Sequence, residues 1–373
     1  MPESVKAGRR PSPPGAVRRP SSSYAAGIRI LALTAVALVA ALLLPTRQQA
    51  EATFRPAPVP LQSQTKPSPF GVNAHIPSAG DFAAMSQAGF GWARIDLTWD
   101  RIEPVRQEFD WATVDRVVEE AQASGINLLG ILGYCPRWAA SGPDAYYPPR
   151  DTALWKAYVT AMVTRYRGRI RYWSLWNEPN SHTFFRGSVE QYIHGVLIPG
   201  ARAAKAADPD CRIVGPELAH LNGAHWDTWL DRILAEAGSS IDVIAMHCYE
   251  DDPAEVFRAL DGRRRPWEKP SVMRIIRDRG QAGKPFWLTE TGWRSNEIGE
   301  AKQARYVLDL FRGVVGRPFI RKVFLFELKD SKSLPGYGLL RLDGTQKPAY
   351  IEITRFIRSQ AIPERIPRPP RPR

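Results

Sequence analysis

The stretches RYWSLWNEPN (residues 171–180) and FWLTETGW (residues 286–293) decide how this chain folds. Each is a short apolar run typical of a buried β-strand, and each closes on a glutamate, Glu178 in the first and Glu290 in the second. Six more apolar runs occur along the chain. Together they predict eight strands: Phe70–His75, Trp92–Leu97, Asn127–Gly133, Arg171–Trp176, Arg212–Pro216, Val243–His247, Phe286–Thr289 and Val323–Phe326.

The segments between these runs have the apolar spacing of amphipathic helices, and Gly125 and Gly238 stand near two helix ends. The predicted helices are Trp111–Ser124, Leu154–Arg167, Val189–Ala207, Trp226–Ala237, Val272–Arg279, Ala301–Val315 and Lys347–Ile357. Alternating strands and helices predict an α/β protein with parallel strands and right-handed crossovers. We therefore expect a (β/α)₈ TIM barrel. An open doubly wound sheet is the alternative, but no glycine-rich phosphate loop follows the first strand.

The basic residues are concentrated in the two tails of the chain. The net charge is +13, of which residues 1–50 contribute +6 and residues 355–373 contribute +5, so the middle is nearly neutral. A nucleic-acid-binding domain needs a basic face of its own, so we expect no nucleic-acid partner. The predicted organisation is a basic tail, an apolar segment, a Pro-rich linker, the barrel and a disordered Pro/Arg-rich tail: residues 1–27, 28–44, 45–69, 70–358 and 359–373.

Residues 28–44 read IRILALTAVALVAALLL and follow a basic flank, which is the charge arrangement of a signal peptide or a signal anchor. Seventeen residues lie at the lower limit for a membrane-spanning helix. We expect a single-pass membrane anchor with the barrel outside the cytoplasm. Cleavage of this segment, giving a secreted protein, stays open.

The two strand-ending glutamates carry the chemistry that we predict. Catalytic groups of (β/α)₈ barrels lie at the carboxyl ends of the strands, and the fourth and seventh strands face each other across the mouth. Two carboxyl groups about 5–5.5 Å apart suit retaining glycoside hydrolysis, with one acting as nucleophile and one as acid/base. Trp173, Trp176 and Trp293 supply apolar surroundings for the acid.

These motifs resemble a known group of enzymes. Asn177-Glu178-Pro179 after the fourth strand, with Thr-Glu290-Thr-Gly-Trp293 after the seventh, is similar to the retaining glycosidases of clan A. Within that clan the chain most resembles family 39, the β-xylosidase and α-L-iduronidase type, including exopolysaccharide-associated glycosidases, and more distantly the family 5 cellulases. The resemblance covers residues 70–350. It implies that Glu178 is the acid/base, that Asn177 is its partner and that Glu290 is the nucleophile.

Looser matches imply further substrate-binding positions. Arg94 resembles the arginine that pairs with the nucleophile, and His247-Cys248-Tyr249 resembles a motif that contacts it. The eighth strand departs from the clan because Phe326-Glu327 stands where a Trp is common. The predicted substrate-binding set is Asn177, Arg94, His247, Tyr249, Trp138, His75, Trp293 and Glu327.

No motif implies a cofactor or a metal, and the three cysteines, Cys135, Cys211 and Cys248, predict no disulfide framework. We expect an oligosaccharide or polysaccharide substrate, with residues 139–150 and Phe184-Phe185 as cleft walls. Two rival functions stay open: a non-catalytic glycan-binding component of a membrane polysaccharide machine, and a transglycosylase that uses the same two carboxylates.

Overall fold

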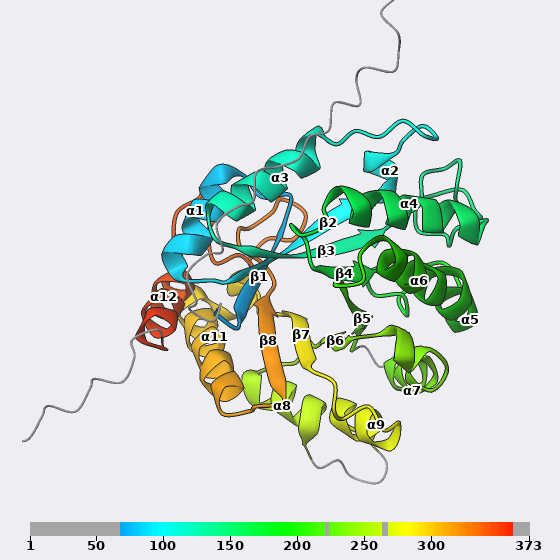
Figure 1. The fold of residues 1–373 in the computed structure, drawn as a ribbon. Helices are drawn as coiled ribbons and strands as arrows, with labels where there is room; N and C mark the ends of the chain where they lie inside the picture. Colours follow the sequence, from blue (N-terminus) through cyan, green and yellow to red (C-terminus); the bar gives the residue numbers. More distant parts are fainter. Residues whose placement is uncertain (1–67, 221–223, 263–267, 361–373) are drawn as a thin grey trace, which may run out of the picture. The chain divides into compact units, whose positions relative to one another are not determined.

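The computed structural model describes residues 68–220, 224–262 and 268–360. Eight parallel strands pair in chain order, and β8 returns to pair with β1, so the sheet is a closed barrel. Figure 1 shows the strands in the centre with helices around them. The TIM-barrel prediction is confirmed. The strands are β1 (Phe70–His75), β2 (Trp92–Thr98), β3 (Asn127–Gly133), β4 (Tyr172–Leu175), β5 (Arg212–Ala219), β6 (Val243–His247), β7 (Phe286–Thr291) and β8 (Ile320–Leu325).

Helices follow the strands and bury one face against the barrel. The longer ones are α1 (Ala79–Ala88), α3 (Ala112–Ala123), α4 (Thr152–Arg165), α6 (Ile198–Ala207), α7 (Trp226–Ala237), α8 (Pro253–Asp261), α9 (Val272–Asp278), α11 (Glu300–Val315) and α12 (Pro348–Gln360). Short helical segments are α2 (Trp99–Ile102), α5 (Val189–Gln191), α10 (Ser295–Ile298), the π-helix η1 (Tyr192–Leu197) and the 3₁₀ turn η3 (Gly238–Ser240). The helix predicted over 189–207 is thus divided into α5, η1 and α6.

The barrel interior is packed by side chains from six strands, which form a cluster separate from the larger core under the helices: Trp92, Leu129, Val214, Val243, Ala245, Trp287 and Phe324. Gly71 on β1 leaves the room that two of these side chains occupy. A Cβ at Gly71 would lie 2.6 Å from the ring of Phe324 and 2.9 Å from Cβ of Trp92. The interior at the amino ends of the strands is therefore filled by side chains, and the open space of the barrel lies at its mouth, where the strands have their carboxyl ends.

The apolar spacing did not predict two helices, α1 and α8, although each begins at a clear capping residue. Ser78 caps α1: its hydroxyl accepts a hydrogen bond from the Asp81 backbone N–H, and the Asp81 carboxylate accepts one from the Ser78 backbone N–H. Asp252 caps α8, where Pro253 occupies the first turn. Apolar spacing alone overlooked both helices, whereas their capping residues indicate where each begins.

The basic N-terminal tail, the apolar segment 28–44, most of the linker and the end of the C-terminal tail lie outside the described residues. The membrane anchor and the location outside the cytoplasm therefore stay predictions. Within residues 68–220, 224–262 and 268–360, no helix has the length and apolar character needed to cross a bilayer.

We expect Leu129→Ala to lower the free energy of unfolding by about 2–5 kcal/mol, because Leu129 is fully buried inside the barrel and truncation leaves a cavity there. Chemical denaturation measures this difference. The matched control is Leu342→Ala, at a leucine that is 55% exposed, which should change stability by less than about 0.5 kcal/mol. Equal effects of the two substitutions would contradict the packed interior.

Candidate active site

Arg94 on β2 lies at the centre of the barrel mouth and is almost fully buried. Its Nε and Nη2 donate to the two carboxylate oxygens of Glu217 at 3.1 and 3.2 Å, and its Nη1 donates to Glu290 Oε1 at 2.6 Å. The same guanidinium donates to Asn73 Oδ1 at 2.8 Å and to Asn177 Oδ1 at 2.7 Å. Burial acts to lower the pKa of Arg94, but the charges of Glu217 and Glu290 outweigh it and raise that pKa. The guanidinium therefore stays charged.

Glu290, at the end of β7, is oriented by a donor at each carboxylate oxygen. Arg94 holds Oε1, and the Tyr249 hydroxyl donates to Oε2 at 2.8 Å. The Arg94 guanidinium places a positive charge directly against this carboxylate. Burial and the charge of Glu290 raise the pKa of Tyr249 well above its ordinary value, so the hydroxyl keeps its proton and stays a donor.

Glu178 faces Glu290 across a buried histidine. His247 Nδ1 lies 2.8 Å from Glu178 Oε1 and 3.5 Å from Glu290 Oε2, so it carries the hydrogen. Burial acts to lower the pKa of His247, but Glu290 and Glu178 raise it above the ordinary value. One oxygen each of Glu178 and Glu290 and one nitrogen of His247 lie within 4.8 Å of one another. The two carboxylates are therefore close enough to act on a single sugar carbon.

His75, at the end of β1, joins two carboxylates on the rim. Its Nδ1 lies 2.8 Å from Asp96 Oδ2 and its Nε2 lies 3.2 Å from Glu327 Oε2. Burial alone would lower the pKa of His75. Its hydrogen bonds and charge interactions with Asp96 and Glu327 outweigh burial and raise that pKa to about 10. His75 is therefore an imidazolium at neutral pH, and it fixes the segment that follows β8 against β2.

These groups surround a cavity of about 280 Å³ at the carboxyl ends of the strands. Asn177 lines it, and because its amide oxygen accepts from Arg94, its NH₂ group is the end left to donate. Phe184, expected as a cleft wall, lines the cavity, whereas its neighbour Phe185 is buried in the core. The predicted residues that line the cavity are His75, Arg94, Asn177, Glu178, Tyr249 and Glu290, and His247 lies directly beneath them.

Besides His247, the structure places three predicted binding residues outside this lining. Trp138 packs edge-on against Trp99 and donates its indole N–H to the backbone of Glu103. Trp293 donates its indole N–H to the Glu250 backbone, so it supports the loop after β6. Glu327 is 2% exposed and reaches the cavity only through His75. Each of these side chains is held by a neighbour that the strand pattern does not reveal.

Glu217 on β5 is the residue that the sequence reasoning missed. It is fully buried, and besides Arg94 it accepts a hydrogen bond from the Ser174 hydroxyl. Arg94 and His247 hold the pKa of Glu217 below its ordinary value, even though burial alone would raise it. The predicted strand ended at Pro216, three residues before the observed end of β5 at Ala219, and so left out Glu217. A lone carboxylate in an apolar strand was the available signal, because an unpaired charge there is costly.

All three cysteines are buried, and no disulfide joins them in the structure. Cys135 follows β3 and Cys248 follows β6, so both lie at the end of the barrel that carries the cavity. Burial raises the pKa of the Cys135 thiol above its ordinary value, which leaves it protonated and unreactive.

A closed parallel barrel with facing carboxylates after β4 and β7 is the arrangement of the clan A glycoside hydrolases, the class that the sequence resembles. Comparison with family models agrees with this: the model of glycosyl hydrolases family 39 matches residues 81–291. That span is more than half of the chain and includes both Glu178 and Glu290. The chain belongs to family 39 of the glycosyl hydrolases.

Curated relatives include two β-xylosidases. The chain is 26% identical over 155 residues to the enzyme of Geobacillus stearothermophilus, which covers 38% of this chain and 31% of that protein. It is 22% identical over 294 residues to the enzyme of Caldicellulosiruptor saccharolyticus, which covers 70% of this chain and 59% of that protein. The chain thus spans about one third to three fifths of these relatives.

Solved structures share the fold. A family 39 glycoside hydrolase from Bacteroides cellulosilyticus WH2 superposes with a TM-score of 0.63 at 21% identity, over 78% of this chain and 63% of that one. A monomeric β-xylosidase from Caulobacter crescentus CB15 gives a TM-score of 0.60 at 19% identity, over 78% and 68% of the two chains.

We expect Glu217→Gln to lower the free energy of unfolding by about 3 kcal/mol at neutral pH, because it leaves the buried Arg94 with one compensating charge fewer. The folded-state pKa of Glu217 is depressed, so its contribution is present above the ordinary value of 4.5 and is lost as the pH falls through the lower folded value. Denaturation curves from pH 7 downward measure the difference.

The control for this prediction is Glu108→Gln, which removes the same charge from an exposed loop. It should leave the unfolding free energy within about 0.5 kcal/mol of the wild type. A pH-independent difference between wild type and Glu217→Gln would show that the carboxylate charge is not what stabilises the mouth.

Proposed function

We propose that this chain is a retaining glycoside hydrolase that cleaves O-glycosidic bonds of a β-linked glycan or exopolysaccharide by double displacement. The observation that carries the proposal is the pair Glu178 and Glu290, with oxygens within 4.8 Å of each other and only one of the two bound to Arg94. Retaining enzymes hold their carboxyl groups about 5–5.5 Å apart, whereas inverting enzymes leave about 6.5–9.5 Å for a water molecule.

The contacts favour different roles for the two glutamates. Glu290 is bound to the Arg94 guanidinium and the Tyr249 hydroxyl, which orient it and stabilise its charge, as a nucleophile requires. No guanidinium contacts Glu178 among the described residues, and His247 Nδ1 lies 2.8 Å from its Oε1. An acid/base needs no fixed cation against its carboxyl group, so we assign this role to Glu178.

In the first step, Glu290 attacks the anomeric carbon and forms a covalent ester with the sugar. The bond from that carbon to the glycosidic oxygen breaks, and Glu178 donates its proton to the leaving oxygen. Asn177 lines the same cavity as both carboxylates, and its NH₂ group donates to a sugar hydroxyl next to the reacting carbon.

In the second step, Glu178 accepts a proton from water, and the oxygen of that water attacks the anomeric carbon. The ester bond to Glu290 breaks, and the sugar leaves with its original anomeric configuration. A sugar hydroxyl in place of water would give transglycosylation through the same residues.

The relatives indicate which substrates to test, because the two described above are β-xylosidases. We propose β-xylosides and β-glucosides as the first substrates to test, because the cavity of about 280 Å³ accepts one pyranose ring among its polar groups.

We expect the full chain to hydrolyse an aryl β-glycoside and to release the β-anomer first, because two displacements restore the configuration. Proton NMR of the fresh product measures this. Glu290→Gln should lower kcat/KM at least about a thousandfold, since the amide is not a nucleophile.

Three results would contradict the proposal. Initial release of the α-anomer would indicate inversion, and full activity of Glu290→Gln would remove the nucleophile assignment. Glycan binding without turnover across a broad panel of wild-type assays would favour the non-catalytic alternative. Glu108→Gln is the matched control, because it makes the same chemical change at an exposed residue that lines neither this cavity nor the one beside it.

We expect Glu178→Ala to lose activity on alkyl glycosides but to retain formation of the covalent intermediate from 2,4-dinitrophenyl glycosides, whose leaving group needs no proton. Added azide should restore turnover at least tenfold and yield a β-glycosyl azide, because the truncated side chain leaves room for a small anion. Steady-state rates and product NMR test this. If azide produced an α-azide, or if rates were equal with both leaving groups, Glu178 would not be the acid/base.

A further inference from the structure

A second cavity, of about 500 Å³, adjoins the proposed reaction centre. The two cavities share Asp96, Thr98 and Tyr134 in their linings, so they adjoin at β2 and at the segment after β3. The remaining walls come from the end of β1, from α2, from the start of α3 and from the segment after β3. We call this space the β2 cavity.

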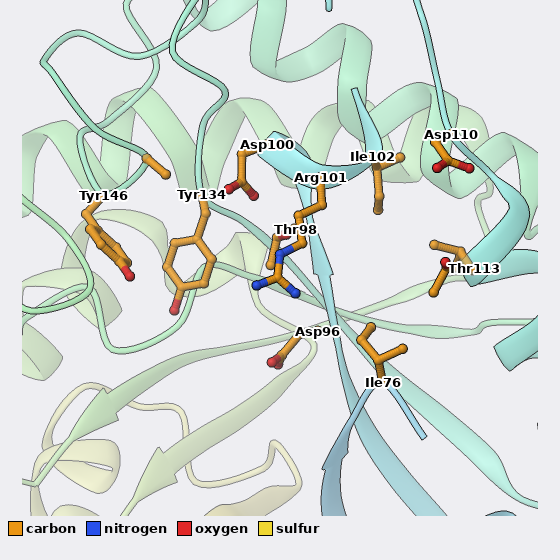
Figure 2. A pocket seen from close by; sticks show the side chains of 12 residues that line it. Ile76, Asp96, Thr98, Asp100, Arg101, Ile102, Asp110, Thr113, Tyr134 and Tyr146 are labelled. Carbon is orange, nitrogen blue, oxygen red and sulfur yellow. The ribbon is translucent and has the colours of Figure 1, made fainter. Parts of the chain in front are cut away.

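One wall of the β2 cavity is aromatic. The rings of Tyr134 and Tyr146 lie 5.3 Å apart at 76°, and Figure 2 shows the two side chains next to each other at one side of the opening. Tyr146 is 36% exposed, so much of its ring is open to a ligand. Exposed aromatic faces bury the apolar faces of pyranose rings without requiring a charged partner.

The floor and the opposite wall are polar. Thr98 Oγ1 and Asp100 Oδ1 are buried atoms without a hydrogen-bond partner in the described part of the chain. Figure 2 shows Asp100 beside the tyrosine pair, while Asp110 and Thr113 lie across the cavity. The lining also holds the carboxylates of Asp96, Asp100 and Asp110 and the hydroxyl group of Thr113. Sugar hydroxyl groups both donate and accept, which suits these polar side chains.

The position of the β2 cavity indicates which side of the scissile bond it serves. Its lining residues come from β1, β2, α2, α3 and the segment after β3, whereas the acid/base Glu178 follows β4. The leaving oxygen must lie beside Glu178 to receive its proton. The sugar that stays bound to Glu290 therefore extends in the other direction, towards β1 and β2.

We propose that the β2 cavity is a second glycone subsite, which binds an uncharged sugar unit linked to the one that Glu290 attacks. The lining holds three carboxylates, Asp96, Asp100 and Asp110. His75 pairs with Asp96 and the Arg101 guanidinium offsets one further charge, so one negative charge is left over and an acidic sugar is repelled. The enzyme then acts on glycans with at least two sugar units on the glycone side, rather than removing single terminal sugars. That such glycans are hydrolysed rests on the proposed function, whereas the binding of the second sugar unit rests on the cavity alone.

The test compares an aryl β-monoside with the matching aryl β-1,4-bioside in the xylose and glucose series, using the full chain. We expect the bioside to have at least about a tenfold higher kcat/KM, mostly through KM, because its second ring fills the β2 cavity. Thr113→Trp, which fills the cavity from α3, should bring this ratio to about one. Ala112→Trp is the matched control, because its exposed side chain is a neighbour on α3 outside the lining.

The outcomes separate this inference from the proposed function. Equal kcat/KM for monoside and bioside in the wild type, or an unchanged ratio in Thr113→Trp, would overturn the second subsite while leaving the hydrolase proposal intact. If no substrate is turned over, calorimetry of xylobiose and cellobiose against xylose and glucose still decides the subsite. Tenfold tighter binding of a disaccharide that Thr113→Trp abolishes supports it, and equal binding overturns it.

The charge of the cavity is tested with an aryl cellobioside and its analogue that carries a carboxylate on the outer ring. We expect the acidic analogue to be at least about tenfold worse, and the double variant Asp100→Asn/Asp110→Asn to recover most of that loss. Glu119→Gln, an exposed carboxylate on α3 outside the lining, should leave the ratio unchanged. A preference for the acidic analogue would overturn the selection for uncharged sugars.

Discussion

The buried guanidinium of Arg94 is the constraint on which the mouth of this barrel depends. A charge removed from water costs several kcal/mol unless partners compensate it, and Arg94 has them from four different strands or strand ends. Glu217 on β5 and Glu290 on β7 supply the charge, while Asn73 and Asn177 supply acceptors. The guanidinium therefore ties together elements that are distant in the sequence, and moving any one of them exposes an unpaired charge.

A second constraint lies in the backbone at the strand ends. His75, Tyr134, Glu178 and Glu217 all have positive φ, which non-glycine residues adopt at a cost of about 1–3 kcal/mol. Each lines or underlies one of the two cavities. The left-handed conformation turns the chain sharply where each strand meets the mouth, so it directs these side chains into the site. At Glu217 and Glu178 the contacts with Arg94 and His247 offset that cost.

The sequence was sufficient for the barrel and for Glu178 and Glu290, because buried strands leave apolar runs and catalytic groups of barrels follow their carboxyl ends. The sequence was insufficient where the role of a residue depends on side-chain contacts between distant strands. The strand containing Glu217 was predicted to stop at Pro216, since a carboxylate does not fit an apolar run until its partner on another strand is known. Trp138 was expected at the substrate, yet its indole N–H is held by the Glu103 backbone.

These contacts separate the residues of the site that buried charge holds in place from the residues that are free to vary. Arg94 contacts Glu217 and Glu290 but not Glu178, and this asymmetry distinguishes the two candidate catalytic glutamates without any loop taking part. Loops form the walls beyond, from the end of β1 to the segment after β3. A wall residue such as Tyr146 is exposed and supports no buried charge, so it can differ between relatives without disturbing the reaction centre. Chemistry in this fold is therefore constrained by buried charge, whereas the choice of glycan depends on surfaces that carry no such constraint.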